Sequence, residues 1–206
     1  MIYDITMMIH KDMQTYKHNK DNKPKIYTNS SHDVNHVHDS SVLLNLHTGT
    51  HIDYPLHMIE NGATSNSEDL SPLIGSAKVY DLSHLEDHIG IDDIKFLNIK
   101  ENDFVLFKTK NSFSESFLDD FIYVNEAASE FLVSKNIRGV GIDGLGIERA
   151  QKNHPTHKNL LGNNIIILEG LRLKDIDKGE YHLIALPLKI QGVEASLVRA
   201  ILTDDK

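Results

Sequence analysis

The sequence predicts an α/β fold, a mixed, sheet-rich single domain with short flanking helices. The chain has 206 residues, enough for one domain with a sizeable core, and we expect residues 1–206 to form that domain. Short apolar runs bounded by glycine, proline or asparagine recur along the chain and are typical of buried strands. The strand–helix–strand spacing between residues 104 and 143 is typical of a parallel crossover.

The first quarter of the chain predicts little regular structure. A short strand is expected over Ile2–Thr6, followed by a polar, lysine-rich loop or arm that runs to Asn29. This arm leads into a weak strand near Ile26–Thr28. The apolar run Val42–Leu46 predicts a largely buried strand that delivers His47 at its end.

The remainder alternates between strand and helix patterns. Strands are expected over Ala77–Leu82, Phe104–Phe107, Gly139–Asp143, Ile165–Leu168, Tyr181–Ile190 and Ala195–Thr203, and short helices over Ile91–Leu97, Asn125–Asn136 and His157–Leu161. Asn125 can cap its helix through its side chain. Pro187 cannot donate a ladder hydrogen bond, so it favours an edge or a bulge in its strand.

Composition excludes several classes of protein. The formal net charge is −9 and no basic stripe with interleaved aromatics occurs, which disfavours nucleic-acid binding. No apolar run approaches the roughly 18 residues that a transmembrane helix needs. The residues Met1–Thr6 lack the pattern of a secretory signal, so we expect a cytoplasmic protein. With no cysteine in the sequence, a metal site must use histidines and carboxylates.

The stretch from His47 to His57 carries the strongest chemical signal. It reads His-Thr-Gly-Thr-His-Ile-Asp-Tyr-Pro-Leu-His. His47, His51 and Asp53 supply imidazole nitrogens and a carboxylate that can bind one metal or bridge two, a set that suits zinc, with manganese or iron as alternatives. The glycine allows a tight turn, so that ligands four residues apart converge without a helix.

Other readings of these residues remain open. The chain has 13 histidines, so some clustering is expected by chance, and a purely structural α/β domain or a non-catalytic metal-binding protein would also fit. His32, His36 and His38 lie in a polar segment without a glycine or proline to fix a geometry, and we expect them at the surface or in support of a site.

A hydrolytic metal site needs further groups from a distant part of the chain. His157 and Glu169 are the best candidates, because Glu169 follows four aliphatic residues and its carboxylate needs a partner when its strand is buried. An ordinary glutamate at the end of a strand is the alternative reading. His154 lies close to His157 and could replace it.

These motifs resemble the cyclase family of metal-dependent hydrolases, which includes the bacterial kynurenine formamidases. The resemblance rests on the His47–His57 stretch, on His157-Lys158-Asn159-Leu160-Leu161, on Ile167–Leu171 and on the C-terminal segments Leu183–Leu188 and Gly192–Ala200. It implies the fold of that family, at least a homodimer, and a divalent metal site, most simply zinc with one or two ions. Carried over by position, one metal would be held by His47, His51 and Asp53, and a second by Asp53, His157 and Glu169, with His57 as the proton-transfer residue.

The chain departs from the family pattern in two places. The early segment Gln14–Lys20 contains Tyr16 where the family has an aromatic residue, but it lacks the Pro-Gly-Asp that should follow. After Asp143, the family's serine and aspartate are replaced by Gly146 and Glu148. Glu148 preserves the charge on a longer stem, whereas Gly146 cannot supply a hydroxyl. Asp143 itself either supports the site or caps a buried turn.

The sequence therefore predicts a hydrolase that cleaves an amide or ester bond of a small molecule with metal-activated water. An arylformamidase acting on N-formylkynurenine is one form of this prediction. A family hydrolase of another cyclic amide, imide or lactone is the alternative, beside the non-catalytic metal-binding protein.

Overall fold

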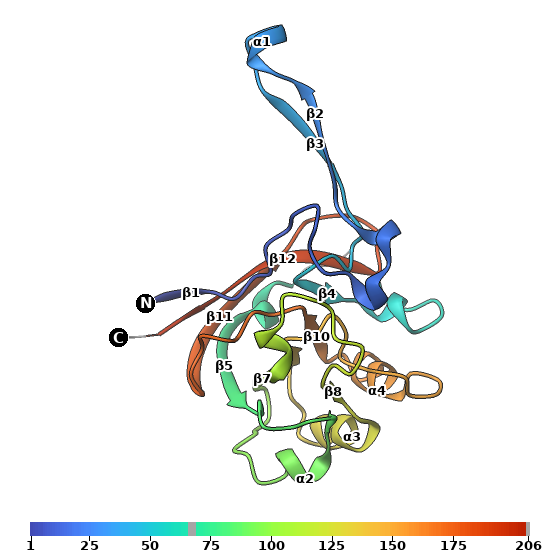
Figure 1. Cartoon of the computed structure of the whole chain (residues 1–206). Coiled ribbons are helices and arrows are strands. Elements are labelled where there is room, and N and C mark those ends of the chain that lie inside the picture. The colour runs from blue at the N-terminus through green and yellow to red at the C-terminus, as the bar shows by residue number, and fades with distance from the viewer. Residues whose placement is uncertain (66–68, 205–206) are drawn as a thin grey trace.

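The computed structural model is organised around an eight-stranded mixed sheet (Figure 1). The structure describes residues 1–65 and 69–204. Within that part of the chain the strands are β1 (Ile2–Asp4), β2 (Lys25–Ser30), β3 (Asp39–Leu43), β4 (His51–Asp53), β5 (Ile74–Asp81), β6 (His88–Ile89), β7 (Phe104–Lys108), β8 (Tyr123–Val124), β9 (Gly139–Ile142), β10 (Ile166–Glu169), β11 (Gly179–Pro187) and β12 (Ala195–Thr203). The helices are α1 (His32–Asn35), α2 (Ile91–Ile94), α3 (Glu126–Ser134) and α4 (Pro155–Gly162).

The main sheet closes on itself. Its strand order is β1-β12-β11-β5-β7-β9-β10-β4, and β4 also pairs with β12. The short strand β4 therefore lies between β10 and the first residues of β12, with antiparallel pairing on both sides. Both backbone edges of β4 are thus used in ladders, which fixes the positions of His51 and Asp53 rigidly.

The parallel half of the sheet confirms the predicted crossover. β7 and β9 pair in parallel, and α3 lies between them in sequence. Asn125 caps α3 as predicted, since its Oδ1 accepts a hydrogen bond from Ala128 N at 2.9 Å. β5 and β10 extend the parallel set on either side.

The apolar core lies on both faces of this sheet. In β7, Val105 and Phe107 pack in the cluster beneath the helices, while Phe104 and Leu106 face a second cluster with β11 and β12 residues. This alternation explains why the central strands have continuous apolar sequences: each face of a buried parallel strand needs apolar side chains. The predicted mixed, sheet-rich fold with short flanking helices is confirmed.

One predicted strand is wrong. The run Val42–Leu46 is not a buried strand: β3 spans Asp39–Leu43, its side chains are exposed, and the chain then turns before His47. β3 pairs with β2 alone, in a separate two-stranded sheet. Figure 1 shows this hairpin projecting away from the main sheet, with α1 at its tip. The apolar residues of this run predicted burial. In the part of the chain that the structure describes, however, no element other than β2 packs against β3.

The prediction for Pro187 holds only locally. β11 lies inside the sheet rather than at its edge, between β12 and β5. Its pairing with β5 stops at Ile184, whereas the pairing with β12 continues to Pro187. The proline therefore ends the strand where it has a single neighbour, so its missing N–H leaves no ladder bond unmade. In the described residues, no helix has the length and apolar character needed to cross a bilayer.

Candidate metal centre

Three predicted ligands meet because of the register between β4 and β10. His51 lies directly opposite Glu169 in this antiparallel pair. His51 and Asp53 are two residues apart in β4, so both side chains leave the same face of the strand. Ile52, between them, points into the core cluster on the other face. Because successive side chains of a strand point to opposite faces, the ligands of β4 lie on one face and the apolar core lies on the other.

His47 reaches the centre from the turn that precedes β4. Asn45 Oδ1 accepts a hydrogen bond from His47 N at 2.8 Å, which holds the turn. Gly49 adopts φ +63°, as the sequence predicts for a tight turn, and it lies against Gly170, whose φ is +70°. A Cβ on Gly170 would stand 2.2 Å from the Gly49 carbonyl oxygen, so this close approach of the two backbones requires glycine.

His157 enters from α4, and a buried glutamate fixes its orientation. Glu148 Oε2 accepts a hydrogen bond from His157 Nδ1 at 2.7 Å and also accepts one from His157 N at 3.2 Å. Because Nδ1 carries the hydrogen in this contact, Nε2 is the nitrogen that faces the centre. The Glu148 carboxylate thus sets the orientation of the His157 ring.

The donor atoms converge on Asp53. His47 Nδ1 lies 3.2 Å from Asp53 Oδ1, His51 Nε2 lies 3.5 Å from the same oxygen, and His157 Nε2 lies 3.8 Å from Oδ2. Glu169 completes the cluster, with Oε2 at 3.3 Å from His51 Nε2 and Oε1 at 3.5 Å from His157 Nε2. All five predicted ligands are therefore brought together.

The charges of this cluster perturb its pKa values. Burial lowers the pKa of His51, but the nearby carboxylates of Glu169 and Asp53 outweigh it and raise the value to about 9. For His157, burial is likewise outweighed, by Glu148 and Glu169, and the pKa rises to about 10. Burial opposes the effect on Glu169 as well, yet the two histidines hold its pKa well below the usual range. Positive charge is therefore strongly favoured between these carboxylates.

The residues fit a divalent metal. His51 Nε2 and both carboxylate oxygens of Asp53 are buried without a hydrogen-bond partner, an arrangement that costs free energy unless a cation satisfies them. Two triads share Asp53, namely His47–Asp53–His57 and His51–Asp53–Glu169, each with its ligand atoms within 4.8 Å of one another. His51 Nδ1 lies 3.0 Å from the Gly49 carbonyl oxygen, so it donates there and leaves Nε2 for a metal.

His57 lies beside the centre and faces a cavity. Its ring centroid is 4.3 Å from that of His47 and 5.7 Å from that of His157. Burial lowers the pKa of His57, which keeps the imidazole neutral near pH 7. The cavity measures about 290 Å³, and its walls include His57, Met58, Leu145, Gly146 and Tyr16. A cavity of about 150 Å³ holds benzene, so this one has room for a small aromatic molecule.

The open alternatives for His154 and Asp143 are resolved by their contacts. His154 is exposed, and its Nδ1 lies 3.9 Å from Glu148 Oε2, so it is His157 that faces Asp53 and Glu169. Asp143 caps a buried turn: its oxygens accept hydrogen bonds from the backbone and hydroxyl groups of Thr109 and Ser112.

The histidines of the early segment lie elsewhere. His32 is the first residue of α1 at the tip of the hairpin and His36 follows the last one; all three histidines, His38 included, are exposed. Figure 1 shows that tip far from β4 and β10. They are therefore surface residues.

Sequence reasoning assigned no role to Glu194. Its Oε1 lies 3.6 Å from His47 Nε2, on the side of that ring away from Asp53 Oδ1. The residue precedes β12, whose pairing with β4 brings it near the turn of His47. Its position in the segment Gly192–Ala200, which resembles the family, was the feature of the sequence that could have indicated a role.

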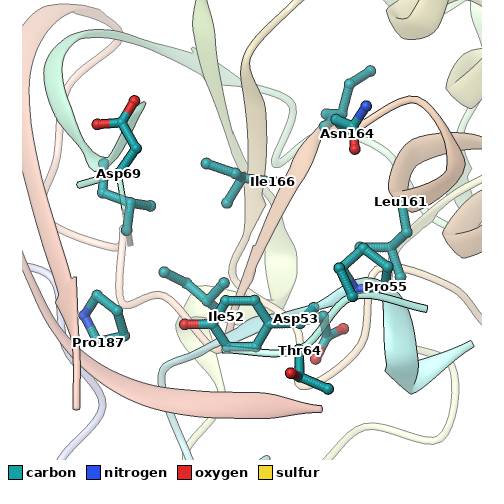
Figure 2. Close-up of a pocket in the computed structure, with 13 residues that line it drawn as sticks. Ile52, Asp53, Pro55, Thr64, Asp69, Leu161, Asn164, Ile166 and Pro187 are labelled. Carbon is teal, nitrogen blue, oxygen red and sulfur yellow. The ribbon is translucent and has the colours of Figure 1, made fainter. Parts of the chain in front are cut away.

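A second cavity, of about 210 Å³, lies near the start of β10 and the end of α4 (Figure 2). Ile52, Ile166 and Pro187 supply apolar surface, and Figure 2 shows Asp69 and Asn164 on opposite sides of it. Asp53 also lies in its wall, but among the described residues that line it there is no histidine.

Solved structures share this fold. A protein described as a predicted metal-dependent hydrolase from Bacillus stearothermophilus is 50% identical, with a TM-score of 0.91 over 98% of this chain and 97% of that chain. An isatin hydrolase bound to the product analogue thioisatinate is 25% identical, with a TM-score of 0.86 over 98% of this chain and 91% of that chain. Together with the donor set, these likenesses define the chain as an enzyme, a hydrolase that depends on a divalent metal.

The family follows from two sequence comparisons. The family described as "Putative cyclase" matches residues 3–149. The kynurenine formamidase of Sphingopyxis alaskensis is 37% identical over 161 residues, which cover 77% of this chain and 77% of that protein. The corresponding enzyme of Bacillus cytotoxicus is 31% identical over 168 residues, covering 81% and 80%. The chain belongs to the cyclase family.

Proposed function

We propose that the chain hydrolyses the amide bond of a small aryl formamide, with N-formylkynurenine as the first candidate substrate. The observation that carries the proposal is the set of buried, unpartnered donor atoms on His51 and Asp53, next to a cavity wide enough for an aromatic ring. The curated relatives that are kynurenine formamidases support the choice of substrate.

The proposed ligands are His47, His51, Asp53, His157 and Glu169, for one or two ions. Nitrogen and oxygen donors without thiolates suit zinc, and manganese is the alternative. A divalent ion bound here would lower the pKa of a water molecule towards about 7 and polarise the scissile carbonyl. Asp53 is the shared residue of the two triads and would bridge a pair of ions.

His57 is the proposed proton-transfer residue. Its half-buried ring stands between those of His47 and His157 and lines the cavity. As a neutral imidazole it accepts the proton of the attacking water and returns it to the departing nitrogen. Glu148 holds His157, and Glu169 Oε1 also accepts a hydrogen bond from Ile147 N at 2.6 Å, so these side chains stay in place while His57 acts.

The same geometry suits a cyclic amide, imide or lactone as a second candidate class. The likeness to an isatin hydrolase over 98% of this chain favours it. A ring-opening hydrolysis needs the same water and the same proton transfer, with the leaving nitrogen or oxygen still attached to the product. Substrate choice therefore depends on the walls of the cavity rather than on the metal ligands.

The test combines metal analysis with a substrate panel of N-formylkynurenine, formanilide, isatin, a lactone and a cyclic imide. His57→Ala should lower kcat by about 10²- to 10⁴-fold while metal content is retained. His84→Ala, at an exposed histidine, is the matched control. Loss of metal from the His57 variant would make it a ligand instead. Stoichiometric metal without hydrolysis across the panel would favour a non-catalytic metal-binding protein.

We also propose a homo-oligomer, at least a dimer, acting as one catalytic domain per chain in the cytoplasm. Support comes from the β2–β3 hairpin, because a two-stranded hairpin alone in water is marginally stable. Ile26 lies opposite Val42 in its ladder, and both are exposed in the single chain. Sedimentation of the double variant Ile26→Lys/Val42→Lys should show a smaller species than the wild type, and an unchanged mass would refute the role of the hairpin.

A further inference from the structure

The early loop of the chain forms one wall of the catalytic cavity. Tyr16 and Lys17 lie in the short turn Tyr16–His18, and both line the cavity that contains His57 and His157. This is the segment that lacks the Pro-Gly-Asp of the family pattern.

Aromatic contacts hold this loop in place. The Tyr16 ring packs edge-on against Phe117, with centroids 5.3 Å apart, and His18 packs edge-on against the same ring at 5.3 Å. On its other side Tyr16 lies against Gly146, where an added Cβ would stand 3.2 Å from the Tyr16 ring. The absence of a side chain at Gly146 thus provides the space that Tyr16 occupies.

The backbone then turns Lys17 back over its neighbour. Lys17 has φ 53° and ψ 33°, and His18 has φ 55°, so two successive residues with side chains adopt the left-handed conformation. Such a pair is unfavourable without tertiary support and is typical of functional loops. As a result, Lys17 Nζ lies 5.3 Å from the centroid of the Tyr16 ring and at the mouth of the cavity.

Lys17 is the one lysine or arginine among the described residues that line this cavity. The carboxylates there already have partners: Glu148 binds His157 and Gln151, and Glu169 belongs to the metal centre. At the same mouth, Asn45 uses its Oδ1 to accept from His47 N, so its side-chain amide N–H groups are oriented away from that contact and remain available as donors. The mouth therefore offers donors and positive charge.

We propose that Lys17 is a specificity-determining residue that binds a carboxylate carried by the substrate at the exposed wall of the catalytic cavity. The inference rests on the proposed function, and it narrows the substrate class to small aryl amides with an anionic substituent. Lys17 supplies the charge, the Asn45 amide supplies a second donor, and Tyr16 supplies an aromatic surface in the same cavity.

Matched substrates test the proposal on the metal-loaded protein. The wild type should prefer 3-formamidobenzoate over 3-formamidobenzamide. Lys17→Met should raise KM for the benzoate about tenfold and change kcat little, because the variant loses one partly exposed charged contact with the substrate. Lys17→Met should leave the benzamide unaffected, and Lys17→Arg should retain the preference. Lys20→Met, which removes a lysine outside the cavity walls, is the control.

Binding gives a readout that does not depend on turnover. Calorimetry should show 3-aminobenzoate binding about tenfold more weakly to Lys17→Met than to the wild type and to Lys20→Met, and 3-aminobenzamide binding equally to all three. If the wild type hydrolyses neither formamide, the proposed function fails, and the binding measurement still decides the role of Lys17. Equal effects on charged and neutral ligands, or no effect on either, would overturn the proposal.

Discussion

Replacing Glu148 by glutamine should weaken metal binding although Glu148 touches no metal-facing atom. Glu148 is 3% exposed, and its carboxylate accepts three hydrogen bonds, from His157 Nδ1, His157 N and Gln151 Nε2. A glutamine of the same size has one acceptor oxygen and one NH2 group. The NH2 group must therefore face a donor, either Gln151 Nε2 or His157 Nδ1.

The magnitude follows from the contacts that are lost. Gln151 cannot adapt by turning its amide over, because its Oε1 accepts from Glu126 N and its Nε2 also donates to Thr156 Oγ1. One hydrogen bond to a charged group is lost, worth about 1.5–3 kcal/mol. Mutations of the groups that orient metal-ligating histidines typically cost about 10- to 100-fold in metal affinity. We expect a loss in that range for Glu148→Gln and a larger one for Glu148→Ala.

Competition with a chromogenic zinc chelator at pH 7 measures the effect directly. Glu130→Gln, at an exposed position of α3, removes the same charge without touching the site and should bind zinc like the wild type. An affinity of Glu148→Gln within twofold of the wild type would show that His157 is oriented by other contacts, and the reasoning would be wrong.

Two further predictions concern stability. Asp143→Ala leaves the donors of Thr109 and Ser112 buried without an acceptor, so urea unfolding should show a loss of about 3–5 kcal/mol, while the folded fraction still binds metal; a loss below about 1 kcal/mol would contradict this accounting. In chelator, the pKa values of about 9 for His51 and about 10 for His157 lie above the unfolded value, so folding favours their protonated forms. The stabilisation by these protons is fully present below about pH 6.5 and is lost as the pH rises through 9 and 10. With zinc bound, which displaces the protons, the stability of the protein should no longer fall over this pH range. Metal-free stability that stays level or rises over this pH range would refute the assignment of charges.

Several elements could be predicted because their signals are local. The asparagine cap of α3, the buried run of β7 and the crossover to β9 depend on short-range spacing and alternation, and each is present. The turn at Gly49 was likewise predicted from the residue type, and its positive φ agrees. Local patterns decide such features because the relevant contacts lie within a few residues.

Local patterns do not predict burial where it depends on distant elements. Val42 and Leu43 were expected inside the sheet, yet they lie on a hairpin that pairs with no strand of the main sheet in the described structure. Apolar residues show that a strand needs cover, but the covering surface can belong to the same chain or to another copy. Composition does not distinguish these cases.

The sequence by itself determined the ligand types and their grouping: the His47–His57 stretch, with His157 and Glu169 far along the chain, specified nitrogen and oxygen donors and no thiolate. Only the tertiary structure decided how they meet, since the register that sets His51 opposite Glu169 is a property of two paired strands. It also decided the roles of Glu148 and Asp143, two buried carboxylates of similar sequence context. One orients His157 and the other caps a turn, because a carboxylate's role depends on which donors the fold places within about 3 Å of it.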